Sequence, residues 1–362
     1  ETIFRKYKDQ GMDNMTITNK IAQEINIAKI LQQSSKRWDG GYVMGGILGH
    51  GDAFVLRDPN GIRPCFYYYN DEFVVAASER PTILTALNMK RDEVKELGCG
   101  EALIVKRDGR VSVEQIIEPA EKPSKCSFER IYFSRGTDSS IYQERKNLGR
   151  NLRESVLKAI NYDLNNTIIS YIPNTASVAF QGLAQSLNDY INQTRINKII
   201  EKQKDGVLNK EELEEIFSQD CVRRDYLVVK DVKMRTFITN ANDRDDMVAH
   251  VYDVTYGQIR DHVDNLVVLD DSIVRGTTLK QSILRIIDRL NPKKIVVASS
   301  APQIRYPDCY GIDMSRMNEF IAFNATIALL KENNLTNIID EVYQKCKAQA
   351  DLPSEEIVNY VR

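Results

Sequence analysis

The chain contains few of the residues that build metal centres and disulfide frameworks. Its 362 residues include six cysteines and three histidines. No two cysteines form a CxxC pair and no histidines stand at metal-ligand spacing, which argues against zinc sites and disulfide frameworks and favours reduced thiols. We therefore expect a cytoplasmic protein whose chemistry does not depend on histidine or cysteine ligands.

Neither sign of charge dominates the sequence. The 49 basic and 51 acidic side chains give a formal net charge of -2, so electrostatics give no reason to expect nucleic acid or an anionic membrane as a partner. No apolar run approaches the roughly 20 residues of a membrane span, and no secretory signal is visible. The hydrophobic content of 42% is typical of an ordinary globular protein, and the length of 362 residues is typical of two or three domains.

Hydrophobic periodicity predicts a sheet-rich first domain. Residues 16–37 carry apolar side chains at helical spacing. Residues 40–106 then form short strand-like runs separated by Gly, Asn and Pro turns. The prolines and charges at 118–123 are typical of a linker, so this domain is expected at 1–122.

Beyond the linker, strands alternate with helices. This order predicts a parallel sheet covered by helices, with ligands bound at the carboxyl ends of its strands. The second domain is expected at 123–323, with a charged helical insertion at about 190–225 and a helical tail at 324–362. The expected strands are 128–135, 166–173, 266–270 and 294–302, and the expected helices are 143–160, 176–188 and 277–290.

The most informative segment is the stretch 267–278. Its apolar run ends in Asp270 and Asp271, and Gly276 with two threonines opens the next amphipathic stretch. Paired carboxylates at a strand end can accept hydrogen bonds from the vicinal hydroxyls of a ribose, and a helix start rich in donors favours a phosphate. Solvated turn residues are the alternative, but the complete pattern predicts a ribose-5-phosphate site.

Several segments in succession resemble one protein family. The 267–278 stretch is similar to the phosphoribosyl pyrophosphate (PRPP) loop of type I phosphoribosyltransferases, and its inner string DDSIVRGTT resembles the glutamine PRPP amidotransferases. The resemblance covers most of the chain. The blocks that carry it are RDPNGIRP (57–64), ASE (77–79), GEALIV (100–105), CSFERIYFSRGTDSSIY (126–142), RTFI (235–238), LDDSIVRGTT (269–278) and ASSAPQIRYPDCYGIDM (298–314).

This resemblance implies both a fold and an activity. The fold is a type I phosphoribosyltransferase parallel sheet with flanking helices, preceded by part of a class II glutaminase domain, the αββα N-terminal-nucleophile fold. In the family, ammonia from glutamine displaces pyrophosphate from C1 of PRPP and gives 5-phosphoribosylamine, the first step of de novo purine synthesis. Purine nucleotides are implied as feedback inhibitors, and a homo-oligomer is expected.

The family pattern also implies roles for individual residues. Asp270 and Asp271 would hold the ribose and Mg²⁺, and Thr175, in a second strand–turn–helix segment, would complete the metal and pyrophosphate site. Lys230 and Arg235 would act in catalysis as part of a mobile hood. The predicted PRPP-binding residues are Asp270, Asp271, Ser272, Ile273, Val274, Arg275, Gly276, Thr277 and Thr278.

The sequence departs from the family pattern at four places. The family's glutaminase nucleophile is an amino-terminal cysteine, whereas this chain begins with Glu1, so we expect a fragment that starts after the nucleophile. Asn174 replaces the acid that usually precedes Thr175, and the block at 240–253 is mostly acidic or neutral instead of basic. Cys346 stands alone near the carboxyl end, so no iron–sulfur cluster is expected.

These departures leave alternatives open. A catalytically weakened module that binds PRPP or a nucleotide for regulation is the main alternative to an enzyme. A nucleobase salvage enzyme would share the loop but would not explain residues 40–105. Residues 201–212 match four positions of an EF-hand calcium loop, but a turn between surface helices explains them more simply.

Overall fold

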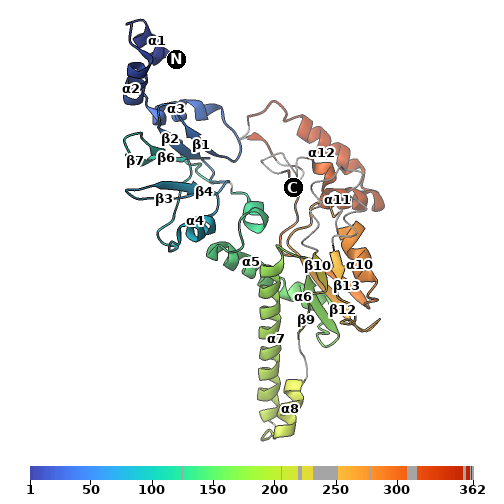
Figure 1. The fold of residues 1–362 in the computed structure, drawn as a ribbon. Helices are drawn as coiled ribbons and strands as arrows, with labels where there is room; N and C mark the ends of the chain where they lie inside the picture. The colour runs from blue at the N-terminus through green and yellow to red at the C-terminus, as the bar shows by residue number, and fades with distance from the viewer. Residues whose placement is uncertain are drawn as a thin grey trace. The chain divides into compact units, whose positions relative to one another are not determined.

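The computed structural model describes residues 1–123, 125–204, 206–218, 222–230, 252–276, 279–307, 316–353, 356–358 and 360. The chain divides into two compact units, Glu1–Arg150 and Asn151–Arg362 (Figure 1). Each unit is described by itself. The domain limits expected from the sequence, at 122/123 and 323/324, stay a prediction.

The first unit contains two antiparallel sheets with helices beside them. The four-stranded sheet has the order β1-β2-β6-β7 and the three-stranded sheet has the order β4-β3-β5. The strands are β1 (Val43–Ile47), β2 (Ala53–Arg57), β3 (Phe66–Tyr69), β4 (Val74–Ala77), β5 (Lys95–Glu96), β6 (Glu101–Val105) and β7 (Val111–Gln115). The helices are α1 (Thr2–Lys8), α2 (Asn14–Glu24), α3 (Ile27–Ser34), α4 (Arg80–Leu87) and α5 (Ser139–Asn151).

Two apolar layers hold this unit together. One layer packs α3 against the four-stranded sheet, through Leu31 and Leu56. The other lies between the two sheets, where Tyr67 of β3 meets Leu103 of β6. One helix layer and two stacked sheets are therefore present, which matches the α, β and β layers at one side of the expected αββα fold.

The predicted helix at 16–37 is broken in two, which corrects that expectation. The Asp13 side chain accepts hydrogen bonds from the backbone N–H groups of Met15 and Thr16, and so caps the start of α2. The Asn26 side chain accepts one from the N–H of Lys29 and caps a new helix, α3. A second cap inside an apolar repeat of helical spacing starts a separate helix, and the spacing alone does not reveal it.

The second unit is built on a parallel sheet of order β13-β12-β8-β9 (Figure 1). All three pairings are parallel. These strands are β8 (Thr167–Tyr171), β9 (Arg223–Arg224), β12 (Asn265–Asp270) and β13 (Lys294–Ser299), and a separate antiparallel pair is formed by β10 (Val228–Lys230) and β11 (Tyr252–Val254). The helices are α6 (Arg153–Ala159), α7 (Ser177–Gln203), α8 (Lys210–Ser218), α10 (Leu284–Asp288), α11 (Ile321–Glu332) and α12 (Asn337–Lys347).

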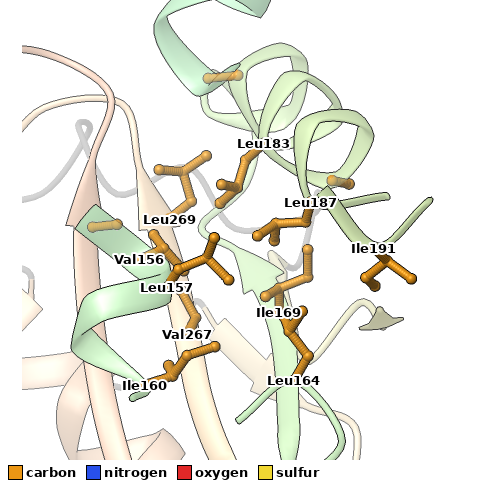
Figure 2. Packing of buried hydrophobic residues seen from close by; sticks show 13 residues of the cluster. Val156, Leu157, Ile160, Leu164, Ile169, Leu183, Leu187, Ile191, Val267 and Leu269 are labelled. Carbon is orange, nitrogen blue, oxygen red and sulfur yellow. The ribbon is translucent and has the colours of Figure 1, made fainter. Parts of the chain in front are cut away.

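Apolar clusters cover both faces of the parallel sheet. Figure 2 shows Leu183 and Leu187 of α7 and Leu157 of α6 packed over Ile169 and Leu269 of the sheet. On the opposite face, Ile283 and Ile287, from the helical segment after β12, pack against apolar residues of β8 and β12. The central strand β12 is consequently buried almost completely, and the predicted helix-covered α/β fold is confirmed.

One predicted strand is wrong. Residues 128–135 contain a helical turn, Glu129–Phe133, and lie in the first unit. The guanidinium of Arg145 on α5 donates to the carbonyl oxygens of Arg130 and Ser134 at 3.0 and 2.6 Å, which satisfies this turn without a partner strand. The two-residue strand β9, which sequence reasoning missed, lies beside β8 instead.

The helices differ from expectation mainly in length. α7 continues to Gln203, well beyond the predicted end at 188, and Figure 1 shows α8 beside its far end. The predicted helix at 143–160 begins earlier and divides at Leu152 into α5 and α6. Among the described residues, no helix combines the length and the apolar character that crossing a membrane requires.

Candidate phosphoribosyl pyrophosphate site

The paired acids stand where the buried central strand ends. Asp270 is the last residue of β12, and its carbonyl accepts a hydrogen bond from the N–H of Ser300 at 3.0 Å. The carbonyl of Asp271 accepts from the N–H of Ala301 at 2.9 Å. The main chain that follows β13 therefore fixes both acids at the carboxyl edge of the sheet, which is the edge where open α/β sheets bind ligands.

The Asp270 carboxyl group lies in an environment that opposes its ionisation. Burial and, after it, the charge of Asp271 raise the pKa of Asp270 from 3.8 to about 7, although its Oδ1 accepts a hydrogen bond from the N–H of Asp271 at 2.9 Å. Burial and a neighbouring like charge both favour the protonated form of Asp270, whereas a bound cation or sugar hydroxyl donors would favour its carboxylate form. A pair of carboxyl groups in this environment is suited to bind a divalent cation or sugar hydroxyls.

The donor set fits magnesium. Among the residues that the structure describes, no group of three or more His, Cys, Asp or Glu side chains could enclose a metal ion. Asp270 and Asp271 therefore offer only a pair of carboxylates. Mg²⁺ is usually held by one or two carboxylates together with substrate oxygens and water, so an open pair of this kind matches its chemistry.

The loop after the acids turns sharply before the next helical segment. The Ser272 hydroxyl donates to Oδ2 of Asp271 at 3.1 Å. Gly276 has φ +70°, a conformation that side chains with a Cβ rarely adopt. Its carbonyl accepts the N–H of Lys280 at 2.9 Å, so the loop leads directly into a helical turn. Thr277 and Thr278 lie outside the described residues.

The second predicted loop begins at the same edge of the sheet. β8 pairs with β12 in parallel, and the N–H of Ile172 donates to the carbonyl of Leu269 at 2.8 Å. The Pro173–Asn174 peptide bond is cis. Thr175 follows half-buried, just before α7 begins at Ser177. The parallel register thus brings Thr175 and the acid pair to one edge, as two loops on neighbouring strands.

The predicted hood is described only in part. Lys230 is half-buried at the end of β10, where it pairs with Tyr252 of β11. Arg235 lies outside the described residues. The roles of Lys230 and Arg235 therefore stay predictions.

Two other motifs have structural functions. In the RDPNGIRP segment the buried Asp58 carboxylate accepts N–H groups from Asn60, Ile62 and Arg63 at 3.0 to 3.1 Å. Arg57 donates to the carbonyls of three residues across the loop, Gly61, Arg63 and Leu97. The hydrogen bonds of these two charged side chains therefore stabilise the conformation of the RDPNGIRP segment.

The segment 201–212, which matches part of an EF-hand calcium loop, also contains residues with a structural function. The Asn209 side chain accepts the N–H of Glu212 at 2.9 Å, and the Glu212 side chain accepts the N–H of Asn209 at 3.1 Å. This reciprocal arrangement is a capping box at the start of α8. The Glu212 carboxylate therefore caps the start of α8. Asp205 lies outside the described residues.

Sequence reasoning missed the residues that support the loop from outside the motif. Ser300 and Ala301 bond to the acid pair, and Ile321 at the start of α11 donates its N–H to the carbonyl of Val274 at 2.8 Å. The first two fall in the ASSAPQIRY block, which carried a family resemblance but no chemical reason. No sequence signal connected Ile321 with the loop.

Comparison with known proteins identifies similar enzymes. No model of a known protein family matches the chain. The amidophosphoribosyltransferase of Escherichia coli (strain K12) is 30% identical over 319 residues, which cover 82% of this chain and 54% of that enzyme. The chain is similar in sequence to amidophosphoribosyltransferases. It spans about half the length of this curated relative.

Solved structures show the same fold. The glutamine PRPP amidotransferase from B. subtilis, complexed with ADP and GMP, matches with a TM-score of 0.61 at 21% identity, over 91% of this chain and 65% of that one. An allosteric regulatory enzyme of purine biosynthesis matches with a TM-score of 0.60 at 23% identity, over 89% and 62%. The fold class predicted for an amidophosphoribosyltransferase relative is thereby confirmed.

Proposed function

We propose that this chain carries the PRPP half-reaction of an amidophosphoribosyltransferase. Ammonia, which comes from glutamine in the full-length enzymes, would displace pyrophosphate from C1 of PRPP and give 5-phosphoribosylamine, in the first step of de novo purine synthesis. The nitrogen of ammonia bonds to C1, the bond from C1 to the pyrophosphate oxygen breaks, and one proton passes to solvent. The observation that carries this proposal is the pair Asp270–Asp271 at the carboxyl end of β12, in a chain related to these enzymes.

The residues at the sheet edge suit the two ends of PRPP. Asp270 and Asp271 would accept hydrogen bonds from the ribose hydroxyls, and the segment Ser272–Thr278 would bind the 5-phosphate at the start of the following helical segment. The loop that contains Thr175 would bind pyrophosphate through its backbone N–H groups. Lys230 and Arg235 would add positive charge on the pyrophosphate side.

Magnesium fits the same scheme. Asp270 and Asp271, with the hydroxyl of Thr175, would hold Mg²⁺, which neutralises the charge that develops on departing pyrophosphate. The raised pKa of Asp270 supports this assignment, because a bound cation would favour the ionised carboxylate.

Two further assignments depend on the relatives. We propose that purine nucleotides bind as inhibitors, because the B. subtilis amidotransferase was solved with ADP and GMP. A cytoplasmic location and a homo-oligomer belong to the same proposal.

The activity can be tested by pyrophosphate release. The 362-residue chain is incubated with PRPP, ammonium chloride and Mg²⁺, and pyrophosphate is measured over time. We expect release that requires both Mg²⁺ and ammonium and that falls at least 100-fold in Asp271→Asn, because loss of an electrostatic contact to the transition state commonly costs that much. Asp340→Asn, at an exposed position in α12, is the matched control. Tight PRPP binding without pyrophosphate release would instead favour the regulatory module.

A further inference from the structure

The helix α11 is attached to the rest of its unit at its amino end. None of its residues from Ile321 to Glu332 is buried. Phe320, the residue just before the helix, is by contrast completely buried. The start of α11 is therefore anchored by the packing of Phe320.

This fixed point lies against the predicted phosphate loop. The N–H of Ile321 donates to the carbonyl of Val274 at 2.8 Å. The guanidinium of Arg275 forms an ion pair with Glu319 at 2.6 Å. A Cβ added to Gly276 would lie 2.7 Å from Cδ1 of Ile321, so the Ile321 side chain occupies the space beside this glycine. The consecutive loop residues Val274, Arg275 and Gly276 therefore each contact the segment Glu319–Ile321.

The other end of the loop is held as well. The hydrogen bonds from Ser300 and Ala301 fix the main chain at the acid pair. The loop is thus held from β13 at its start and from α11 at its end. A loop that is already ordered loses less conformational freedom when its ligand binds, and this raises affinity without any direct contact between the support and the ligand.

We propose that Ile321 is a positioning residue for PRPP, and that the start of α11 holds residues 274–276 in the conformation that receives the 5-phosphate. This inference rests on the proposed function. Ile321 would act through the loop, by its backbone bond to Val274 and by its side chain beside Gly276. The hydrogen bond persists in any non-proline variant, so the side-chain contribution can be tested separately.

The first test compares two truncations on the same helix. Ile321→Ala removes the Cδ1 contact, and because Ile321 is 42% exposed the fold should tolerate the change. Leu329→Ala, at a position 57% exposed, is the matched control. We expect the Kd for PRPP with Mg²⁺ to rise about tenfold in Ile321→Ala, which is about 1.4 kcal/mol, and to stay within about twofold in Leu329→Ala.

Kinetics separate positioning from general damage. In Ile321→Ala the KM for PRPP should rise while kcat at saturating PRPP is retained, because the substrate can still order the loop once it is bound. Ile321→Val, which lacks only Cδ1, should lie between Ile321→Ala and the wild type. A fall in kcat with an unchanged KM would overturn the positioning role.

Hydrogen exchange in the wild-type chain gives a measurement that needs no variant. PRPP with Mg²⁺ should slow amide exchange at 319–323, a segment outside the predicted PRPP-binding residues, because the N–H of Ile321 is bonded to the loop. If wild type binds PRPP and releases pyrophosphate, but neither its exchange at 319–323 nor the affinity of Ile321→Ala changes, the positioning role is wrong and the proposed function stands. If wild type does not bind PRPP, both are wrong.

Discussion

The half-buried carboxyl group of Asp270 at the end of β12 should make the ligand-free protein less stable at neutral pH. Asp270→Asn keeps the shape of the side chain and its acceptor oxygen but removes the ionisable group. Burial and the neighbouring Asp271 raise the pKa of Asp270 from 3.8 to about 7. Between these two values the unfolded chain has lost the proton that the folded protein still holds, so ionisation favours unfolding in the wild type.

The size of the effect follows from the shift. One pKa unit corresponds to about 1.4 kcal/mol of free energy, so a shift from 3.8 to about 7 sets an upper limit of about 4 kcal/mol. Below pH 3.8 the carboxyl group is protonated in both states and contributes no pH dependence. The free energy of unfolding of the wild type should then fall relative to Asp270→Asn as the pH rises towards 7, and the difference should become constant above it.

Urea denaturation at pH 5, 6.5 and 8, without Mg²⁺ or PRPP, measures this difference. Asp270→Asn should gain stability over the wild type as the pH rises, while its affinity for PRPP falls at least tenfold. The exposed variant Asp340→Asn should follow the wild type at each pH. A difference between Asp270→Asn and wild type that does not change with pH would refute the electrostatic explanation.

Four further predictions concern contacts that stabilise the two units. Asp264 is fully buried and accepts hydrogen bonds from Arg223 at 2.7 Å and Arg260 at 2.5 Å. Asp264→Ala should lower the free energy of unfolding by about 2 kcal/mol, measured by urea denaturation, because both arginines can still reach solvent. Burial tends to raise the pKa of Asp264, but these hydrogen bonds outweigh burial and lower the pKa from 3.8 to about 2. The stability that Asp264 contributes should therefore be present above pH 4 and be lost as the pH falls through 2, and circular dichroism can measure this loss. Gly100 has φ +71°, and a Cβ added there would lie 2.1 Å from the carbonyl oxygen of Ile117. Gly100→Ala should therefore lower the melting temperature by several degrees in calorimetry. An unchanged melting temperature would mean that the loop relaxes freely around the added methyl group. Asn209→Ala removes half of the capping box and should cost about 1 kcal/mol, with loss of helical signal as the readout.

The sequence predicted the elements that local chemistry dictates. The run Val267–Leu269 is apolar and is followed by two acids, a turn and a helical stretch, and this pattern gave the central strand and the loop at its end. β12 is buried on both faces, as a continuous apolar run in a parallel sheet requires. The neighbouring strands β8 and β13 were predicted by the same pattern.

Tertiary contacts decided the elements that were missed. Ile131, Tyr132 and Phe133 have strand-forming side chains, yet hydrogen bonds from Arg145 complete a helical turn there. β9 consists of two arginines, and no periodicity can be read from two residues. The contact between Ile321 and Gly276 joins segments far apart in the chain, so neither segment carries a local signal for it.

The two arginines of β9 also affect how this protein behaves in concentrated solution. An edge strand exposes unpaired N–H and C=O groups, which a strand of another molecule can join to start aggregation. β9 offers only two residues, with Arg223 tied to Asp264 and Arg224 exposed to solvent. A second copy that approaches with its own β9 edge would find little backbone to pair with and would bring like positive charge, so this edge of the sheet is poorly suited to edge-to-edge assembly.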